Sequence, residues 1–125
     1  MPTFKELIGT DKDQQCPRSY ILALMDTSHV INGKWKLPIL ASLLRGVDRF
    51  KDLLDRIEKI TPRMLSKELK ELELNGLVER KVHDTTPVLI EYHLTASGKD
   101  ITNVIDAMID WGVRHRKQVI RPVTV

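Results

Sequence analysis

The residues best suited to chemistry in this sequence are two basic side chains, Arg63 and Lys67, which lie four positions apart. At 3.6 residues per turn, this spacing places both on one face of a helix. A guanidinium binds the paired acceptors of a guanine edge, whereas an ammonium acts as a point charge toward phosphate or a base. The face is therefore predicted to recognise duplex DNA, with these two residues as the leading base contacts. Further candidates in the same helix are Thr61, Met64, Ser66 and Lys70.

The helix that carries these residues has clear ends in the sequence. Thr61 can accept a hydrogen bond from a free amide of the first turn, and Pro62 follows where a missing N–H is tolerated. Asn75-Gly76 favours a helix end because both residues tolerate positive φ. The opposite, apolar face is predicted to be buried and consists of Leu65, Leu69 and Leu72. The alternative is an ordinary surface helix whose basic residues pair with Glu68, Glu71 and Glu73.

The neighbouring segments favour the DNA interpretation. Residues 49–57 form a second amphipathic helix about two turns long, and only residues 58–60 join it to the basic helix, as in a helix-turn-helix. Residues 77–83 and 88–94 are rich in β-forming side chains and flank a polar turn, so they predict a hairpin. The expected fold class is mainly α with a small β-hairpin (α+β). This is a winged helix-turn-helix, whose hairpin lies over backbone phosphates.

Phosphate contacts are expected from basic and hydroxyl side chains near the helix pair and on the hairpin. They are Lys34, Lys36, Arg49, Lys51, Lys81, His83, Thr85 and Thr86.

Three further helices are predicted at residues 20–30, 33–45 and 95–119, within one domain spanning residues 1–125. Residues 1–15 carry no strong pattern and are predicted to form a flexible arm. The first of the three helices is apolar on more than one side, and the last is longer than the core of a small domain. Both helices are therefore expected to pack against a second copy of the chain. The alternative for residues 95–119 is a helix folded back on its own domain. The predicted dimer contacts are Ile21, Leu22, Met25, Ile101, Val104, Ile105, Met108, Trp111 and Gly112, the last allowing close approach.

Composition sets broad limits on function. A net charge of +3 permits a polyanionic partner but does not require one. No apolar run approaches the ~20 residues of a membrane span, and a single cysteine favours a reducing compartment, so we expect a cytoplasmic protein without membrane association. No catalytic motif is present, so an enzyme is not expected. No metal or other cofactor is expected either, because ligand spacing is lacking among Cys16, His29, His83, His93 and His115.

Cys16 has two possible roles. It precedes Pro17 at a predicted helix start, where the positive end of the helix and nearby Arg18 would favour a reactive thiolate. The alternative is a half-buried thiol that packs at the dimer contact.

Five local motifs lie along the chain: Cys16-Pro17, Gly33-Lys34-Trp35-Lys36 with Ile39-Leu40, Arg49-Phe50-Lys51-Asp52-Leu53, L-x-x-x-L-x-x-L-x-x-x-G-L from Leu65 to Leu77, and Ile90-Glu91-Tyr92-His93-Leu94-Thr95 with Gly98. In order and spacing they make the chain similar, over about residues 16–113, to the HxlR family of bacterial winged helix-turn-helix transcription regulators. The resemblance implies a homodimer, built from the N- and C-terminal helices, that presents two recognition helices to a pseudo-palindromic operator. In some members a cysteine before the first helix senses oxidants or electrophiles, which would be Cys16 here.

The leading hypothesis is therefore a homodimeric, sequence-specific regulator that binds double-stranded DNA and acts as a repressor. The alternative is a winged-helix module for protein–protein contact, in which the outward basic residues meet an acidic partner. A basic second helix followed by a hairpin favours DNA.

Overall fold

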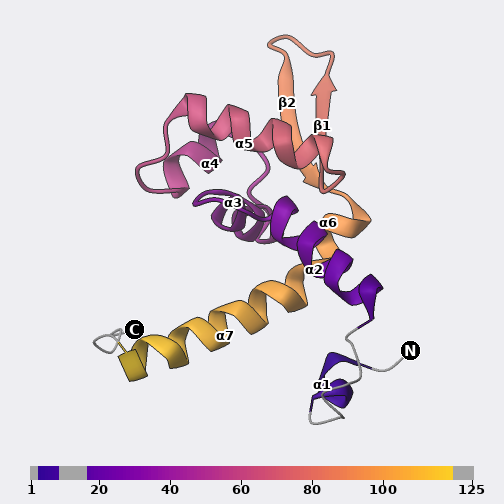
Figure 1. Ribbon diagram of the computed structural model, residues 1–125. Coiled ribbons are helices and arrows are strands. Elements are labelled where there is room, and N and C mark those ends of the chain that lie inside the picture. The colour runs from indigo at the N-terminus through magenta and orange to yellow at the C-terminus, as the bar shows by residue number, and fades with distance from the viewer. Residues whose placement is uncertain (1–2, 9–16, 120–125) are drawn as a thin grey trace. The chain divides into compact units, whose positions relative to one another are not determined.

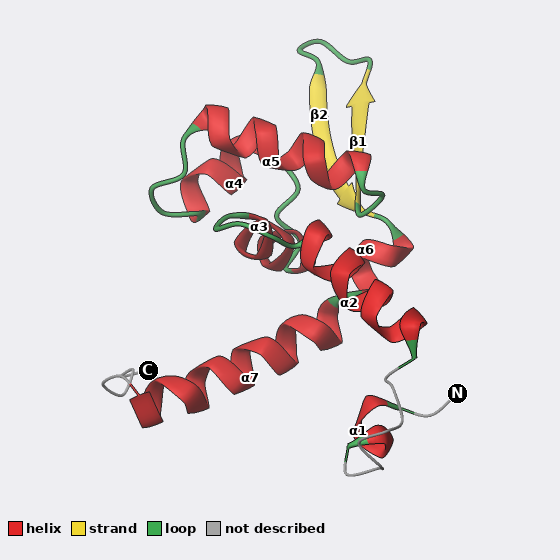
Figure 2. Cartoon of the chain, in the orientation of Figure 1, coloured by secondary structure: helices red, strands yellow, loops and turns green. Residues whose placement is uncertain are grey.

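The computed structural model describes residues 3–8 and 17–119, and the chain divides into two units, Met1–Asn32 and Gly33–Val125. Figures 1 and 2 label the helices and strands of both units. The first unit contains helices α1 (Phe4–Leu7) and α2 (Arg18–Val30). Cys16, the predicted sensor, lies outside the described residues.

Helix α1 is a single short turn within residues 1–15, the segment predicted to form a flexible arm. Thr3 and Glu6 form a reciprocal capping box: the Thr3 hydroxyl accepts from the Glu6 amide, and the Glu6 carboxylate accepts from the Thr3 amide. The Thr-x-x-Glu spacing satisfies two free amides and so favours one helical turn within this segment.

The second unit contains the predicted helix pair and hairpin, surrounded by three more helices. Its elements are α3 (Lys36–Leu44), α4 (Phe50–Arg56), α5 (Pro62–Leu74), β1 (Val78–His83), β2 (Leu89–Leu94), α6 (Ala96–Asp100) and α7 (Thr102–Val119). Helix α3 lies at the centre, because it contacts α4, α5, α7 and β2. The buried apolar side chains are Ile39, Leu40, Leu43, Leu53, Ile57, Ile60, Leu65, Leu69, Leu72, Leu77, Val78 and Ile105. This arrangement, mainly α with one two-stranded antiparallel sheet, confirms the expected fold class.

Helix α5 begins and ends where the sequence predicts. The Thr61 hydroxyl accepts a hydrogen bond from the Met64 amide at 3.2 Å, and Pro62 occupies the first turn. Asn75 terminates the helix, and Gly76 follows with φ +80°, a conformation that costs glycine little. The leucine face is buried as expected, so the opposite face of α5 is turned outward.

The hairpin is anchored at its base and along one edge. Strands β1 and β2 pair in antiparallel register from Val78 opposite Leu94 to His83 opposite Leu89. The Tyr92 amide donates to the carbonyl oxygen of Asp48 at 2.7 Å, which ties β2 to the segment before α4. At the base, the Thr95 amide donates to the Leu77 carbonyl, and a Cβ at buried Gly98 would collide with that same oxygen. Position 98 therefore requires glycine for close packing.

The C-terminal helix predicted as one element is two, and the single-helix expectation is corrected. Thr95 caps α6 as expected, accepting from the Gly98 amide at 3.1 Å. The Lys99 carbonyl then accepts from the Ile101 amide and from the Thr102 hydroxyl, so a tight turn ends α6 before α7 begins. In the described ranges 3–8 and 17–119, no helix has both the length and the apolar character needed to cross a membrane.

Candidate nucleic-acid interface

The outward face of α5 carries the candidate base contacts. Arg63, Lys67 and Lys70 are all exposed, as are Thr61 and Ser66. Met64 is 42% exposed and supplies an apolar group beside them. The face therefore combines positive charge with hydroxyl and apolar contacts, the mixture that base-edge recognition uses.

Lys36 occupies a different place from the one predicted. Its residue exposure is 4%, and its ammonium lies 2.8 Å from Glu68 and in contact with Glu71, both on α5. Burial acts to lower the pKa of Lys36, but the hydrogen bonds and charges of the two glutamates outweigh it, so the pKa lies above its ordinary value. The expectation of a phosphate contact at Lys36 is corrected: this residue is a buried ionic link between α3 and α5.

The link to Lys36 also determines which charged residues of α5 form ion pairs. The alternative interpretation of the helix had its basic residues pair with Glu68, Glu71 and Glu73. The first two of these glutamates bind Lys36 instead. Across the described residues 17–119, no ion pair engages Arg63, Lys67 or Lys70. Lys36 therefore engages Glu68 and Glu71, while the basic residues Arg63, Lys67 and Lys70 face solvent.

Three of the other phosphate candidates lie at or near the starts of α3 and α4. Lys34, Arg49 and Lys51 are exposed, and the Lys34 ammonium lies 4.8 Å from the centre of the Trp35 ring. These three cations could move toward a phosphate, although Lys34 would have to leave the indole ring.

The hairpin, or wing, presents Lys81, Thr85 and Thr86 at its surface. The Thr85 hydroxyl donates to the Pro87 carbonyl at 2.7 Å and so helps shape the turn. His83 is less available than predicted because its Nε2 is paired with Glu91 Oε1 across the hairpin.

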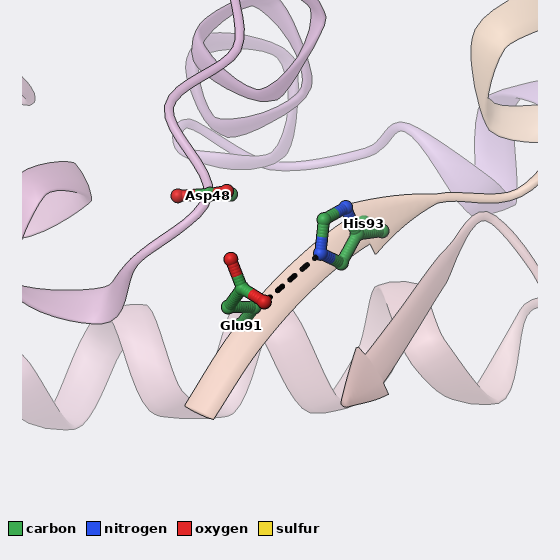
Figure 3. A group of neighbouring side chains, drawn as sticks. All are labelled: Asp48, Glu91 and His93. Atoms are coloured by element: carbon green, nitrogen blue, oxygen red, sulfur yellow. Dashed lines mark ion pairs between the residues drawn. The ribbon is translucent and has the colours of Figure 1, made fainter. Parts of the chain in front are cut away.

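Glu91 is the centre of a polar group on the wing. The hydrogen bond with His83 is the main reason why the pKa of Glu91 lies below its ordinary value; burial opposes this shift, and contacts with Asp48 and His93 add to it. Figure 3 shows the Asp48, Glu91 and His93 side chains gathered between the segment before α4 and strand β2. Sequence reasoning missed this group, although the Glu91-x-His93 spacing on one strand face was a usable signal.

The predicted dimer contacts on α7 are of two kinds. Val104, Met108 and Trp111 are 40%, 43% and 59% exposed and line a shallow apolar groove along the helix. Ile105 is buried and faces the core of its own unit, where α7 packs on α3, so its assignment to the dimer contact is corrected. Ile101 and Gly112 are half-buried. On α2, the apolar candidates Ile21, Leu22 and Met25 are exposed.

A short-linked helix pair, an outward basic second helix and an antiparallel hairpin together define a winged helix-turn-helix protein. The HxlR-like helix-turn-helix family matches residues 30–120, and this chain belongs to that family. It is 38% identical over 104 residues to an uncharacterized HTH-type transcriptional regulator of Methanothermobacter thermautotrophicus, covering 83% of this chain and 79% of the relative.

Two solved structures share the fold. The reduced form of the redox regulator HypR has 34% sequence identity and a TM-score of 0.71, covering 78% of this chain and 96% of HypR. The reduced form of the transcriptional regulator YodB from Bacillus subtilis has 32% identity and a TM-score of 0.68, covering 89% of this chain and all of YodB. The chain is thus a transcriptional regulator of the helix-turn-helix type.

Proposed function

We propose that this regulator binds duplex DNA sequence-specifically as a homodimer and represses transcription from a pseudo-palindromic operator. The observation that carries the proposal is the division of charge on α5: Glu68 and Glu71 are bound to Lys36, while Arg63 and Lys67 face solvent without an ion pair among the described residues. Cations gathered on one exposed helix face attract a polyanion, and phosphate and guanine are their natural ligands in duplex DNA.

In the proposed complex, α5 enters the major groove with its N-terminal half against base edges. Arg63 and Lys67 contact bases, with Thr61, Met64, Ser66 and Lys70 around them. Backbone phosphates are bound by Lys34, Arg49, Lys51, Lys81, Thr85 and Thr86. A dimer bound in this way would cover the operator and exclude other proteins from it, which supports repression.

The direct test is a binding titration with duplex DNA taken from upstream of the protein's own gene and its neighbours. An inverted repeat with half-sites about 10 bp apart, or a multiple of that, is expected to bind more tightly than random duplex. If about six phosphates are neutralised, the logarithm of the association constant should fall with log salt at a slope near −5. A flat salt response would instead support the alternative, a winged-helix module that contacts an acidic protein.

Arg63 gives the sharpest test of base reading. We expect Arg63→Ala to weaken operator binding by about 1–3 kcal/mol and to relax the preference at one base pair in each half-site, because a bidentate guanine contact is lost. Lys34→Ala is the matched control, since it removes one exposed cation away from α5 and should weaken operator and random DNA alike. Fluorescence anisotropy with both duplexes measures the two losses. Equal losses for Arg63→Ala on both duplexes would remove Arg63 from the base-reading set.

Redox sensing at Cys16 is the further part of the proposal. Its support is the residue's place beside Pro17 and Arg18 in the sequence and the similarity of the chain to HypR, which is named a redox regulator. We expect diamide to release the parent protein from its operator and to leave Cys16→Ser bound, with dithiothreitol reversing the release. Identical diamide titration curves for parent and variant would make Cys16 a packing residue and place the signal elsewhere.

A further inference from the structure

Three metal-ligating side chains from two separate segments converge beside the wing. Asp48 lies in the segment between α3 and α4, whereas Glu91 and His93 lie two residues apart on β2 and share one strand face. One ligand atom from each residue lies within 4.8 Å of the other two, and all three residues are half-buried. His93 Nε2 is 3.7 Å from Glu91 Oε1.

Backbone structure holds these groups together. The hydrogen bond from the Tyr92 amide to the Asp48 carbonyl, 2.7 Å long, places Asp48 beside β2 at the residue between Glu91 and His93. The register of the hairpin fixes the position of the two strand residues in turn. The fold therefore brings the three residues together, and side-chain rotation sets only the distances between their ligand atoms.

The three ligand atoms favour one class of metal ion. Two carboxylate oxygens and one imidazole nitrogen suit a first-row transition ion such as Zn²⁺, whereas Ca²⁺ and Mg²⁺ prefer shells of six or more oxygens. With metal–ligand bonds of about 2.0–2.2 Å in a tetrahedron, neighbouring donors lie roughly 3.3 Å apart. The donors here would need to approach by about 1.5 Å at most, which side-chain rotation can supply, and water could fill the fourth position.

The surroundings supply access and charge compensation. A cavity of about 370 Å³ opens beside the cluster, and its lining includes Asp48, His93 and the exposed Lys99. A divalent cation bound between Asp48 and Glu91 would compensate the negative charge of their carboxylates. His83, which is paired with Glu91, stands where an outer partner would orient a metal-bound carboxylate.

We propose that Asp48, Glu91 and His93 form a binding site for a divalent transition-metal ion of the zinc class. His83 orients Glu91 from outside the site. Because the ligands come from β2 and from the segment that leads into α4, a bound ion fastens the wing to the helix pair. The binding site stands independently of the proposed function, whereas any effect of the ion on DNA affinity rests on it.

The test is a titration of EDTA-treated full-length protein with Zn²⁺ by calorimetry and with Co²⁺ by visible absorption. We expect one ion per chain, and tetrahedral Co²⁺ bands that disappear in His93→Gln. Glu91→Gln should weaken binding at least tenfold, since changes to outer partners alone typically cost about 10–100-fold. Asp84→Asn is the matched control, because it neutralises an exposed carboxylate of the same hairpin outside the cluster. Circular dichroism checks that each variant is folded.

Several outcomes would overturn the site. These are the absence of saturable binding by the parent, equal affinities for Glu91→Gln and Asp84→Asn, or Ca²⁺ binding as tightly as Zn²⁺. Loss of Zn²⁺ binding in Cys16→Ser would assign the ion to the thiol instead. Measuring operator binding with and without Zn²⁺ separates the two proposals. If the protein binds the metal but no DNA, only the proposed function is contradicted. If the metal-bound protein binds DNA with unchanged affinity, only the coupling of the metal to the wing is contradicted.

Discussion

Replacing Lys36 with Met should lower the free energy of unfolding by about 3 kcal/mol, because it leaves a buried carboxylate without its counter-charge. The side chain of Glu68 is only 12% exposed, so it cannot regain full hydration where it lies. Glu71 is 40% exposed and can turn toward water, which keeps the expected loss at the lower end of the range for broken buried pairs. For a domain of this size the loss corresponds to roughly 10 °C in melting temperature.

Urea denaturation of parent and variant measures this effect, and Lys34→Met is its matched control. Lys34 is exposed two residues away, so its replacement should change stability by no more than about 0.5 kcal/mol. Lys36→Met combined with Glu68→Leu should recover much of the loss, since an apolar pair needs no charge compensation. Equal denaturation midpoints for Lys36→Met and the parent would contradict the role of this ion pair in joining α3 to α5.

The contribution of Lys36 to the free energy of unfolding should decrease at high pH. Because the pKa of Lys36 is raised in the folded state, its contribution is fully present below the unfolded pKa of about 10.4 and is lost as pH rises through the folded pKa. The stability difference between parent and Lys36→Met should therefore stay constant from about pH 7 to 9 and shrink above pH 10.5. A difference that vanished near pH 8 would show that the ammonium is not held by the glutamates.

Short-range chemistry made most of the second unit predictable. The start of α5 depends on Thr61 and Pro62, and its end depends on Asn75-Gly76. The spacing of three leucines predicts its buried face. The hairpin followed from two β-rich runs around a polar turn, and its strands lie within a residue of the predicted limits. Each of these features is decided within a few residues of where it occurs.

The errors came from contacts that join distant residues. Lys36 resembled a surface cation because nothing near it in the sequence shows that Glu68, 32 positions later, lies 2.8 Å away. The cluster of Asp48 with Glu91 and His93 was missed for the same reason, since the two segments meet only when β2 packs beside the residues before α4. Ile105 had the right spacing for a dimer seam, but packing of α7 on α3 buries it within one chain.

The dimer contact is a proposal, and introducing one charged side chain on α7 tests it. Met108 is 43% exposed on α7 and sits in an apolar groove with Val104 and Trp111, and the C-terminal part of α7 stands clear of α4 and α5 in Figure 1. Trp111 stacks on His115 at 4.6 Å, which stiffens this side of the helix. We propose that a second copy of α7 covers this groove, since a twofold contact would bring the same apolar side chains against each other.

Met108→Asp should therefore convert the dimer to a monomer without unfolding the chain. A twofold contact would receive two carboxylates, each of which costs several kcal/mol to bury without a partner charge. In the isolated chain the same aspartate faces water, so the unfolding free energy of the monomer should change little. Leu74→Asp is the matched control, since Leu74 is a 78% exposed apolar residue on α5, away from α7. Sedimentation velocity at micromolar concentration gives the oligomeric state of each variant.

The DNA consequence follows from the geometry of two linked reading helices. With only one recognition helix available per particle, Met108→Asp should bind an inverted repeat about 100-fold or more weakly than the parent, because the gain from binding the second half-site within one complex is lost. Binding to a single half-site should be nearly unchanged, since Met108 lies on α7 and the proposed base contacts lie on α5. If Met108→Asp stays dimeric, the dimer contact does not lie in the α7 groove. If the parent protein is monomeric at micromolar concentration, the proposed mechanism does not include a dimer. If the variant is monomeric yet binds the inverted repeat as tightly as the parent, the two half-sites are occupied independently, and α7 has no part in reading the operator.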